Sequence, residues 1–314
     1  MYSSITSLSK HGYRPGLSST EYTLKILEEL KNRIGQGEAF HKVFVDLASR
    51  VLVERPANAG AINALREIGL TYLNEGVDKA REEVAKWIRD VKQMCKEAAL
   101  VASHRVTEND TIMTLSNGMC LRYFFSKLAE DGKNVRVYIM ESRPGMEGLD
   151  LAGFLDKLGF DVYLIVDSAA RFFMKDITRV FVGVEAVAIN GAIIAKTGTS
   201  LLALVANEAR VRVFAIAPLY KFSFETILGE LLKIPEGGWE LLMDNETRKE
   251  LPREYRARVP LYDVTPPSLI DGLATEHGLF APQAIPVVLK QVYGAFPIHV
   301  EPLESIIEKV KRSG

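Results

Sequence analysis

The sequence predicts an α/β protein with an N-terminal helical domain (residues 1–105) and a C-terminal domain (residues 106–314) built on a parallel sheet flanked by helices. Apolar residues recur at helical spacing in the first third of the chain. Beyond it, short apolar runs rich in β-branched residues alternate with helical stretches. The 314 residues are 47% hydrophobic and 25% charged, the composition of a globular chain long enough for two domains.

The helical pattern of the first third extends from about residue 20 to residue 103. Its apolar positions include Tyr22, Ile26, Leu27, Leu30, Phe40, Val43, Phe44, Leu47, Val84, Trp87, Ile88 and Val91. Turn signals interrupt the pattern at 34–37, 54–60 and 74–78. Helices of ordinary length joined by short turns are therefore expected.

Five short apolar runs in the second part are expected to be strands, at 111–115, 135–140, 161–166, 179–189 and 211–217. Because nearly all of their residues are apolar, both faces of the sheet should be buried. Helical stretches at 119–130, 148–158 and 201–209 separate these runs. This alternation is typical of a Rossmann-like parallel sheet, in which ligands bind beyond the carboxyl ends of the strands.

Charge and hydropathy exclude several function classes. The chain has 39 Lys and Arg against 40 Asp and Glu, so no global basic field favours direct nucleic-acid binding. No apolar run approaches the roughly 20 residues that cross a bilayer. Residues 1–19 lack the apolar core of a signal peptide, so a cytoplasmic protein without a membrane partner is expected.

The two cysteines, Cys95 and Cys120, have no neighbour at metal-ligand spacing. They predict a reducing compartment, two free thiols and no bound metal, and no cofactor is expected. Cys120 is interpreted as a small core residue one turn into a helix.

Polar and charged residues follow the predicted strands, where helix amino termini could receive an anion. Arg143 could bind a phosphate through two parallel hydrogen bonds, or pair with Glu141 or Glu147 at the surface. Lys196 precedes the turn at 197–199, which could either receive an anion or cap the next helix.

Glu185 is an acidic residue inside the longest apolar run, and carboxylates are rarely buried without a partner. It is expected to face a cavity with Lys196 or Lys221 as its counter-ion. Both a catalytic carboxylate and a structural ion pair fit this position.

The segments at 141–170, 180–208, 217–223 and 262–271 resemble, in order, one family of known proteins. That family contains the alpha, beta and delta regulatory subunits of eukaryotic translation initiation factor 2B, their archaeal homologues, and isomerases of ribose 1,5-bisphosphate and of 5-methylthioribose 1-phosphate. The resemblance covers about residues 106–294. It implies homodimers or hexamers formed through the C-terminal domain, and association with initiation factor 2.

In the isomerases of this family a cysteine and an aspartate move a proton between C1 and C2 of an aldose phosphate. The positions that match them are Ser116 and Glu185. A serine hydroxyl has a far higher pKa than a thiol, and Cys120 lies four residues further, about 6 Å along a helix. The expected function is therefore that of a catalytically silent regulatory subunit. The alternative is ribose 1,5-bisphosphate isomerase, with Glu185 as acid/base and Ser116 or Cys120 in the other role.

The resemblance also implies a pocket for a phosphorylated sugar or nucleotide. The positions expected to bind this ligand are Arg55, Asn117, Gly118, Arg143, Asn190, Lys196 and Lys221. One departure is Ala195, which stands where the family has an asparagine before the lysine.

Overall fold

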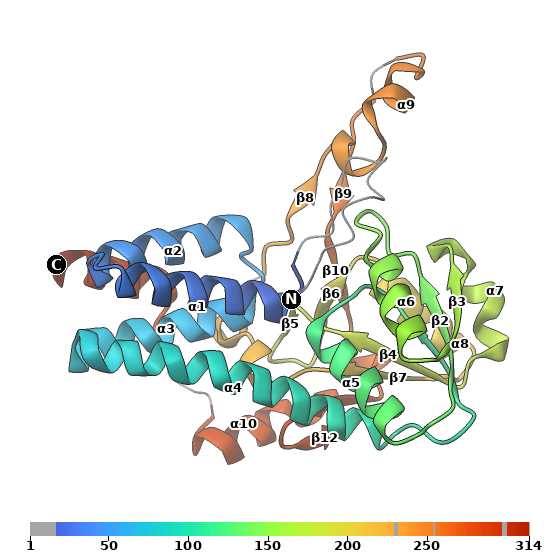
Figure 1. Cartoon of the computed structure of the whole chain (residues 1–314), viewed down its shortest axis with the longest axis horizontal. Coiled ribbons are helices and arrows are strands. Elements are labelled where there is room, and N and C mark those ends of the chain that lie inside the picture. Colours follow the sequence, from blue (N-terminus) through green and yellow to red (C-terminus); the bar gives the residue numbers. More distant parts are fainter. Residues whose placement is uncertain (1–16, 229–231, 254, 297–299, 314) are drawn as a thin grey trace.

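The computed structural model describes residues 17–228, 232–253, 255–296 and 300–313. It confirms the α/β class, with long helices at one end of the molecule and a mostly parallel sheet at the other (Figure 1). The first helices are α1 (Ser19–Gly35), α2 (Phe40–Glu54), α3 (Ala59–Glu75) and α4 (Val77–Ser103). They are separated at the turns predicted from the sequence.

The main sheet has seven strands. In spatial order they are β12 (Gly278–Phe280), β11 (Gly272–Thr275), β7 (Arg212–Ile216), β4 (Arg179–Gly183), β1 (Thr111–Thr114), β2 (Arg136–Met140) and β3 (Asp161–Ile165). Only β12 is antiparallel to its neighbour in this sheet. From β1 the chain adds β2 and β3 on one side and then β4 and β7 on the other. The strand order therefore reverses between β1 and β4, which is where ligands bind in open α/β sheets.

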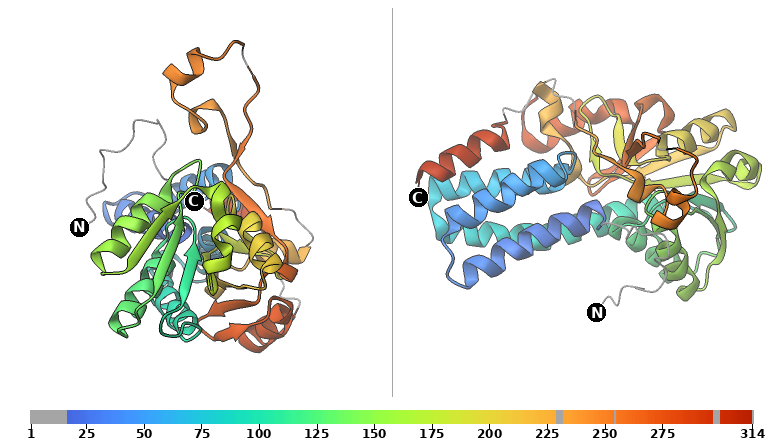
Figure 2. Two further views of the ribbon diagram at one scale, coloured as in Figure 1. Left: turned by 90° about the vertical axis from the view of Figure 1, so that its right-hand side faces the viewer. Right: turned by 90° about the horizontal axis from the view of Figure 1, so that it is seen from above.

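Helices cover both faces of this sheet (Figures 1 and 2). One face packs on α4, α5 (Met119–Glu130) and α6 (Glu147–Lys157), and the other on α7 (Ala170–Phe173), α8 (Thr199–Glu208) and α10 (Ile285–Tyr293). Successive strand residues alternate between the two cores: Ile112 belongs to the first and Met113 to the second. The apolar runs of the inner strands arise from this double burial. The expectation of double burial is wrong for the edge strand β3, where Tyr163 and Leu164 are 43% and 46% exposed.

The prediction of a single strand at 179–189 is wrong. The chain leaves the main sheet after Gly183, and β5 (Ala186–Val187) joins β6 (Ile193–Lys196) and β10 (Tyr262–Thr265) in a separate antiparallel sheet. The backbone N–H of Glu185 already donates to the Ile194 carbonyl, at 2.8 Å. Both pieces are buried, so hydropathy does not reveal the change of sheet.

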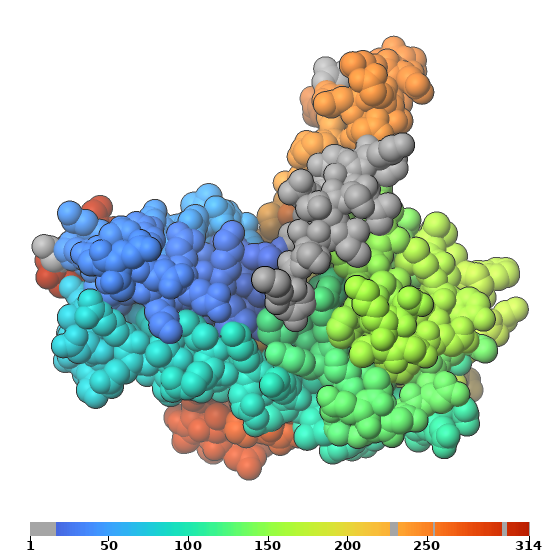
Figure 3. Space-filling model, viewed as in Figure 1, coloured from blue at the N-terminus to red at the C-terminus, as the bar shows by residue number. Residues whose placement is uncertain are grey.

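An arm extends from the body between β7 and β10 (Figure 3). It contains β8 (Glu236–Gly237), α9 (Asn245–Lys249) and β9 (Val259–Pro260), with β8 antiparallel to β9. The last helix, α11 (Leu303–Ser313), packs against α2 and α3 and adds Leu303, Ile306 and Val310 to their apolar core. This segment of the expected C-terminal domain thus lies with the N-terminal helices.

Cys95 on α4 and Cys120 on α5 form a disulfide, so the expectation of two free thiols is wrong. The long helix α4 runs along α5 and brings the two Cα atoms within 5.1 Å. Their separation of 25 residues contains no signal of this packing. Within the described ranges, no helix is both long and apolar enough to cross a bilayer.

Candidate functional site

A cavity of about 180 Å³ lies beyond the carboxyl ends of β1 and β4, at the point where the strand order reverses. Its walls come from the start of α1, the α2–α3 turn, and the connections that follow β1 and β4. The predicted site residues that line it are Arg55, Ser116, Asn117, Gly118, Glu185, Lys196 and Lys221. The N-terminal helices and the sheet therefore build this site together.

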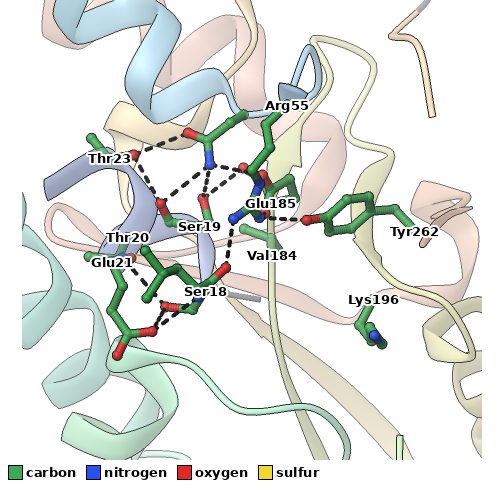
Figure 4. A network of polar contacts seen from close by, with 12 residues as sticks. Ser18, Ser19, Thr20, Glu21, Thr23, Arg55, Val184, Glu185, Lys196 and Tyr262 are labelled. Atoms are coloured by element: carbon green, nitrogen blue, oxygen red, sulfur yellow. Dashed lines mark hydrogen bonds and ion pairs between the residues drawn. The ribbon is translucent and has the colours of Figure 1, made fainter. Parts of the chain in front are cut away.

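Glu185 lies in the cavity wall with its carboxylate held by two side chains from the α2–α3 turn. Arg55 Nη2 donates to Oε2 at 2.7 Å, and Asn58 Nδ2 donates to Oε1 at 2.8 Å. The side chains of Arg55 and Glu185 are only 13% and 3% exposed. Arg55 also donates to the Leu17 carbonyl and to the hydroxyl of Tyr262 (Figure 4). The expected lysine counter-ion is thus replaced by Arg55.

Lys196 pairs with a different carboxylate. Its Nζ donates to Glu147 Oε1 at 2.6 Å, and the two side chains are 9% and 10% exposed. Glu147 opens α6 and lines the same cavity. From the sequence, Glu147 was expected only as a possible surface partner of Arg143.

Lys221 is buried at the floor of the cavity, and its Nζ donates to the Val184 carbonyl at 2.9 Å. Burial lowers the pKa of Lys221 to about 8, with Glu185 acting to raise it and Arg55 to lower it. The amine is therefore mostly protonated at neutral pH. A buried cation with one neutral acceptor favours an anionic ligand.

The start of α5 presents backbone to the cavity. Gly118 is the N-cap residue and supplies no side-chain cap, while the Asn117 amide oxygen accepts from Arg122. Ser116 has a left-handed backbone (φ 66°), and its N–H donates to Ser142 Oγ. The first turn of α5 is therefore suited to receive a phosphate of a bound ligand.

The other predicted anion site is filled by protein. The carboxylate of Asp263, on β10, accepts from the N–H groups of Gly198 and Ser200 at the start of α8. Burial raises the pKa of Asp263, and the two N–H groups act to lower it. The N–H groups of Gly198 and Ser200 are thus already capped by a carboxylate from a distant strand.

Two expected ligand residues do not line the cavity. Arg143 donates from Nη2 to the Leu242 carbonyl in the arm, and its backbone N–H donates to Asp167. Asn190 closes the turn between β5 and β6, where its Oδ1 accepts from the Ala192 N–H. The family resemblance implied that both residues bind the ligand, but their side chains contact other parts of the protein.

Cys120 also lines the cavity, with its sulfur 3.6 Å from Thr20 Oγ1 and bonded to Cys95. The disulfide leaves no thiol for proton transfer, so Cys120 cannot take the second role of the isomerase alternative. No group of three or more metal-ligating side chains occurs in the part of the chain that the structure describes.

The sequence profile of the initiation factor 2 subunit family matches residues 22–282. A ribose 1,5-bisphosphate isomerase of Methanocaldococcus jannaschii is 34% identical over 281 residues, which cover 87% of this chain and 86% of that protein. One from Thermococcus kodakarensis is 30% identical and covers 91% of both chains. The crystal structure of a Pyrococcus horikoshii translation initiation factor eIF-2B superposes with a TM-score of 0.67 at 26% identity, covering 84% of this chain and 89% of that one.

These relatives correct the function expected from the sequence. Six archaeal relatives, the two above among them, bear the name ribose 1,5-bisphosphate isomerase. Their names contradict a catalytically silent regulatory subunit and favour the isomerase alternative.

Proposed function

The chain belongs to the initiation factor 2 subunit family, and we propose that it is an isomerase that converts ribose 1,5-bisphosphate to ribulose 1,5-bisphosphate. The observation that supports this most is the buried carboxylate of Glu185, fixed in the cavity by Arg55 and Asn58. An aldose–ketose conversion moves protons among carbon and oxygen atoms of one sugar. A positioned carboxylate performs such transfers.

The cavity also offers what two phosphate groups require. Lys196 and Lys221 supply buried positive charge, and the uncapped start of α5 supplies backbone N–H groups. Since these groups come from separate strand ends, a ligand with a phosphate at each end could contact both kinds of site. This supports a sugar bisphosphate over a ligand with a single charged end.

The reaction requires ring opening and a hydrogen shift. The bond between C1 and the ring oxygen breaks and that oxygen gains a proton, while C2 loses a proton to give an enol. The enol hydroxyl then loses its proton as C1 gains one, which leaves the ketone at C2. We assign to Glu185 the proton that leaves C2 and returns to C1. Ser116 lines the same cavity, but a hydroxyl without an activating base is a weak proton carrier near neutral pH.

Incubation of the purified protein with ribose 1,5-bisphosphate tests the proposal directly. Phosphorus NMR should show ribulose 1,5-bisphosphate, at a turnover of about one per second or more. Glu185→Gln should lower kcat by about a hundredfold or more, whereas Glu141→Gln, outside the cavity, should not. A wild-type protein without turnover would refute the function, and full activity in Glu185→Gln would refute the assignment.

Binding of the phosphates has its own test. Lys196→Met should weaken binding by about 1.5–3 kcal/mol, the usual range for hydrogen bonds to charged groups. Arg143→Met is the matched control, because Arg143 lies outside the cavity wall. Equal affinities of the two variants in calorimetry would contradict the placement of the ligand.

We also propose that the chain self-associates through the sheet domain. Large apolar side chains are exposed there: Phe172 on α7 by 69%, Leu201 and Leu204 on α8 by 51% and 54%, and Val264 on β10 by 48%. Sedimentation velocity should detect a dimer or hexamer, and Leu204→Lys should dissociate it. Association with initiation factor 2 remains a prediction for a pull-down experiment.

A further inference from the structure

One of the two carboxylate oxygens of Glu147 has a hydrogen-bond partner and the other has none among the described residues. Its Oε1 accepts from Lys196, whereas Oε2 is buried and accepts no hydrogen bond from any described residue. The side chain is nine-tenths buried and lines the cavity. A buried carboxylate oxygen without a partner is costly, so a ligand hydroxyl in the cavity is the natural group to satisfy it.

The backbone around Glu147 is built to hold this carboxylate in place. A Cβ atom at Gly145 would lie 2.4 Å from Glu147 Oε1, and one at Gly148 would lie 2.0 Å from the Met140 carbonyl oxygen. Met146, between them, adopts a left-handed conformation at the start of α6. Side chains at either glycine would displace Glu147, so the connection between β2 and α6 specifies its position.

We propose that Glu147 is the second proton-transfer residue of the isomerase, an inference that rests on the proposed function. Glu185 and Glu147 reach the cavity from different strand ends, and each is paired with one cation. Both oxygens of Glu185 already accept hydrogen bonds, whereas Oε2 of Glu147 is free to carry a proton. Cys120 is unavailable because its sulfur is bonded to Cys95.

The proton balance closes with these two residues. Glu185 removes the proton from C2 and returns it to C1. The Glu147 carboxylate accepts the C2 hydroxyl proton on Oε2 and passes it to the ring oxygen as the bond from that oxygen to C1 breaks. Both residues end in the state in which they began, and no hydrogen is gained or lost by the sugar.

Steady-state kinetics of Glu147→Gln distinguish this role from a merely structural one. Glutamine can still accept a hydrogen bond from Lys196 but cannot donate a carboxyl proton. We expect kcat to fall about a hundredfold or more, with KM for ribose 1,5-bisphosphate within threefold and the melting temperature nearly unchanged. Glu141→Gln, from the same connection but outside the cavity, should leave both constants unchanged.

A second variant guards against a folding defect. Glu147→Ala should lose activity in the same way, and added formate should restore part of kcat because a small carboxylic acid fits the space left. An active wild type with Glu147→Gln within threefold of its kcat, or with only KM raised, would overturn the inference and leave the proposed function standing. A wild type without turnover would instead remove the proposed function.

Discussion

Removal of the positive charge of Arg55 should destabilise the protein strongly, because it leaves the Glu185 carboxylate buried without its ion-pair partner. Arg55 Nη2 lies 2.7 Å from Glu185 Oε2, and the side chains of Arg55 and Glu185 are 13% and 3% exposed. Breaking a buried pair of this kind costs about 3–5 kcal/mol. In Arg55→Met, Asn58 still donates to Glu185 and the buried Lys221 still provides a favourable field. The expected loss therefore lies at the lower end, about 3 kcal/mol.

Urea denaturation followed by circular dichroism measures this loss. Arg50→Met is the matched control, since its pair with Glu29 is about one third exposed and should contribute less than about 1 kcal/mol. The double variant Arg55→Met, Glu185→Gln should lose less than the sum of the two single variants, by about 1.5 kcal/mol or more. A loss below 1 kcal/mol in Arg55→Met, or strict additivity in the double variant, would refute the buried pair.

Three further predictions concern stability. Reduction of the Cys95–Cys120 disulfide frees a loop of 25 residues in the unfolded chain and should cost about 3–4 kcal/mol in urea denaturation; a double alanine variant should not respond to reductant. The pKa of buried Lys221, about 8, is below its unfolded value near 10.4, so the unfolded chain binds more protons between these limits. The free energy of unfolding should thus rise as pH increases from about 8 to 10. The same rise in Lys221→Met would show that Lys221 does not cause it. Asp263→Ala should remove the cap of α8 and lower the free energy of unfolding by about 0.5–2 kcal/mol. Faster amide hydrogen exchange in the first turn of α8 would show that the loss arises there.

The fold class was predictable because hydropathy patterns are local. Double burial makes the central strands largely apolar, and the runs at 111–115 and 211–217 match β1 and β7. The departure at 179–189 has a physical origin, since residues on both sides of Glu185 are buried in different sheets. The packing of α11 on α2 and α3 was equally hidden, because a helix pattern does not specify which surface covers its apolar face.

Part of the site was also predictable. The family resemblance matched Ser116 and Glu185 to the two catalytic positions of the isomerases, and both residues line the cavity at the carboxyl edge of the sheet. Asn58 and Glu147 were missed because their roles depend on which way a side chain points. The same limit explains Arg143, whose guanidinium turns toward the arm although its position in the sequence is at a strand end.

The position of Lys221 depends on the helical domain as much as on the sheet. Asn63, on α3, donates from Nδ2 to the carbonyls of Tyr220 and Phe222, the residues on either side of Lys221, at 3.0 and 2.8 Å. Its Oδ1 accepts from Arg66, which is buried and pairs with Glu225.

Arg55 and Asn58 fix Glu185 in the same way, from the turn that precedes α3. The carboxylate that we propose as acid/base and the amine that we propose as a phosphate-binding group are therefore both positioned by side chains of the N-terminal helices. Because preorganised groups need no rearrangement during the reaction, this arrangement suits proton transfer within a small sugar. The sheet domain alone would lack the restraints that orient Glu185 and Lys221, so the proposed activity should require the N-terminal helices as well.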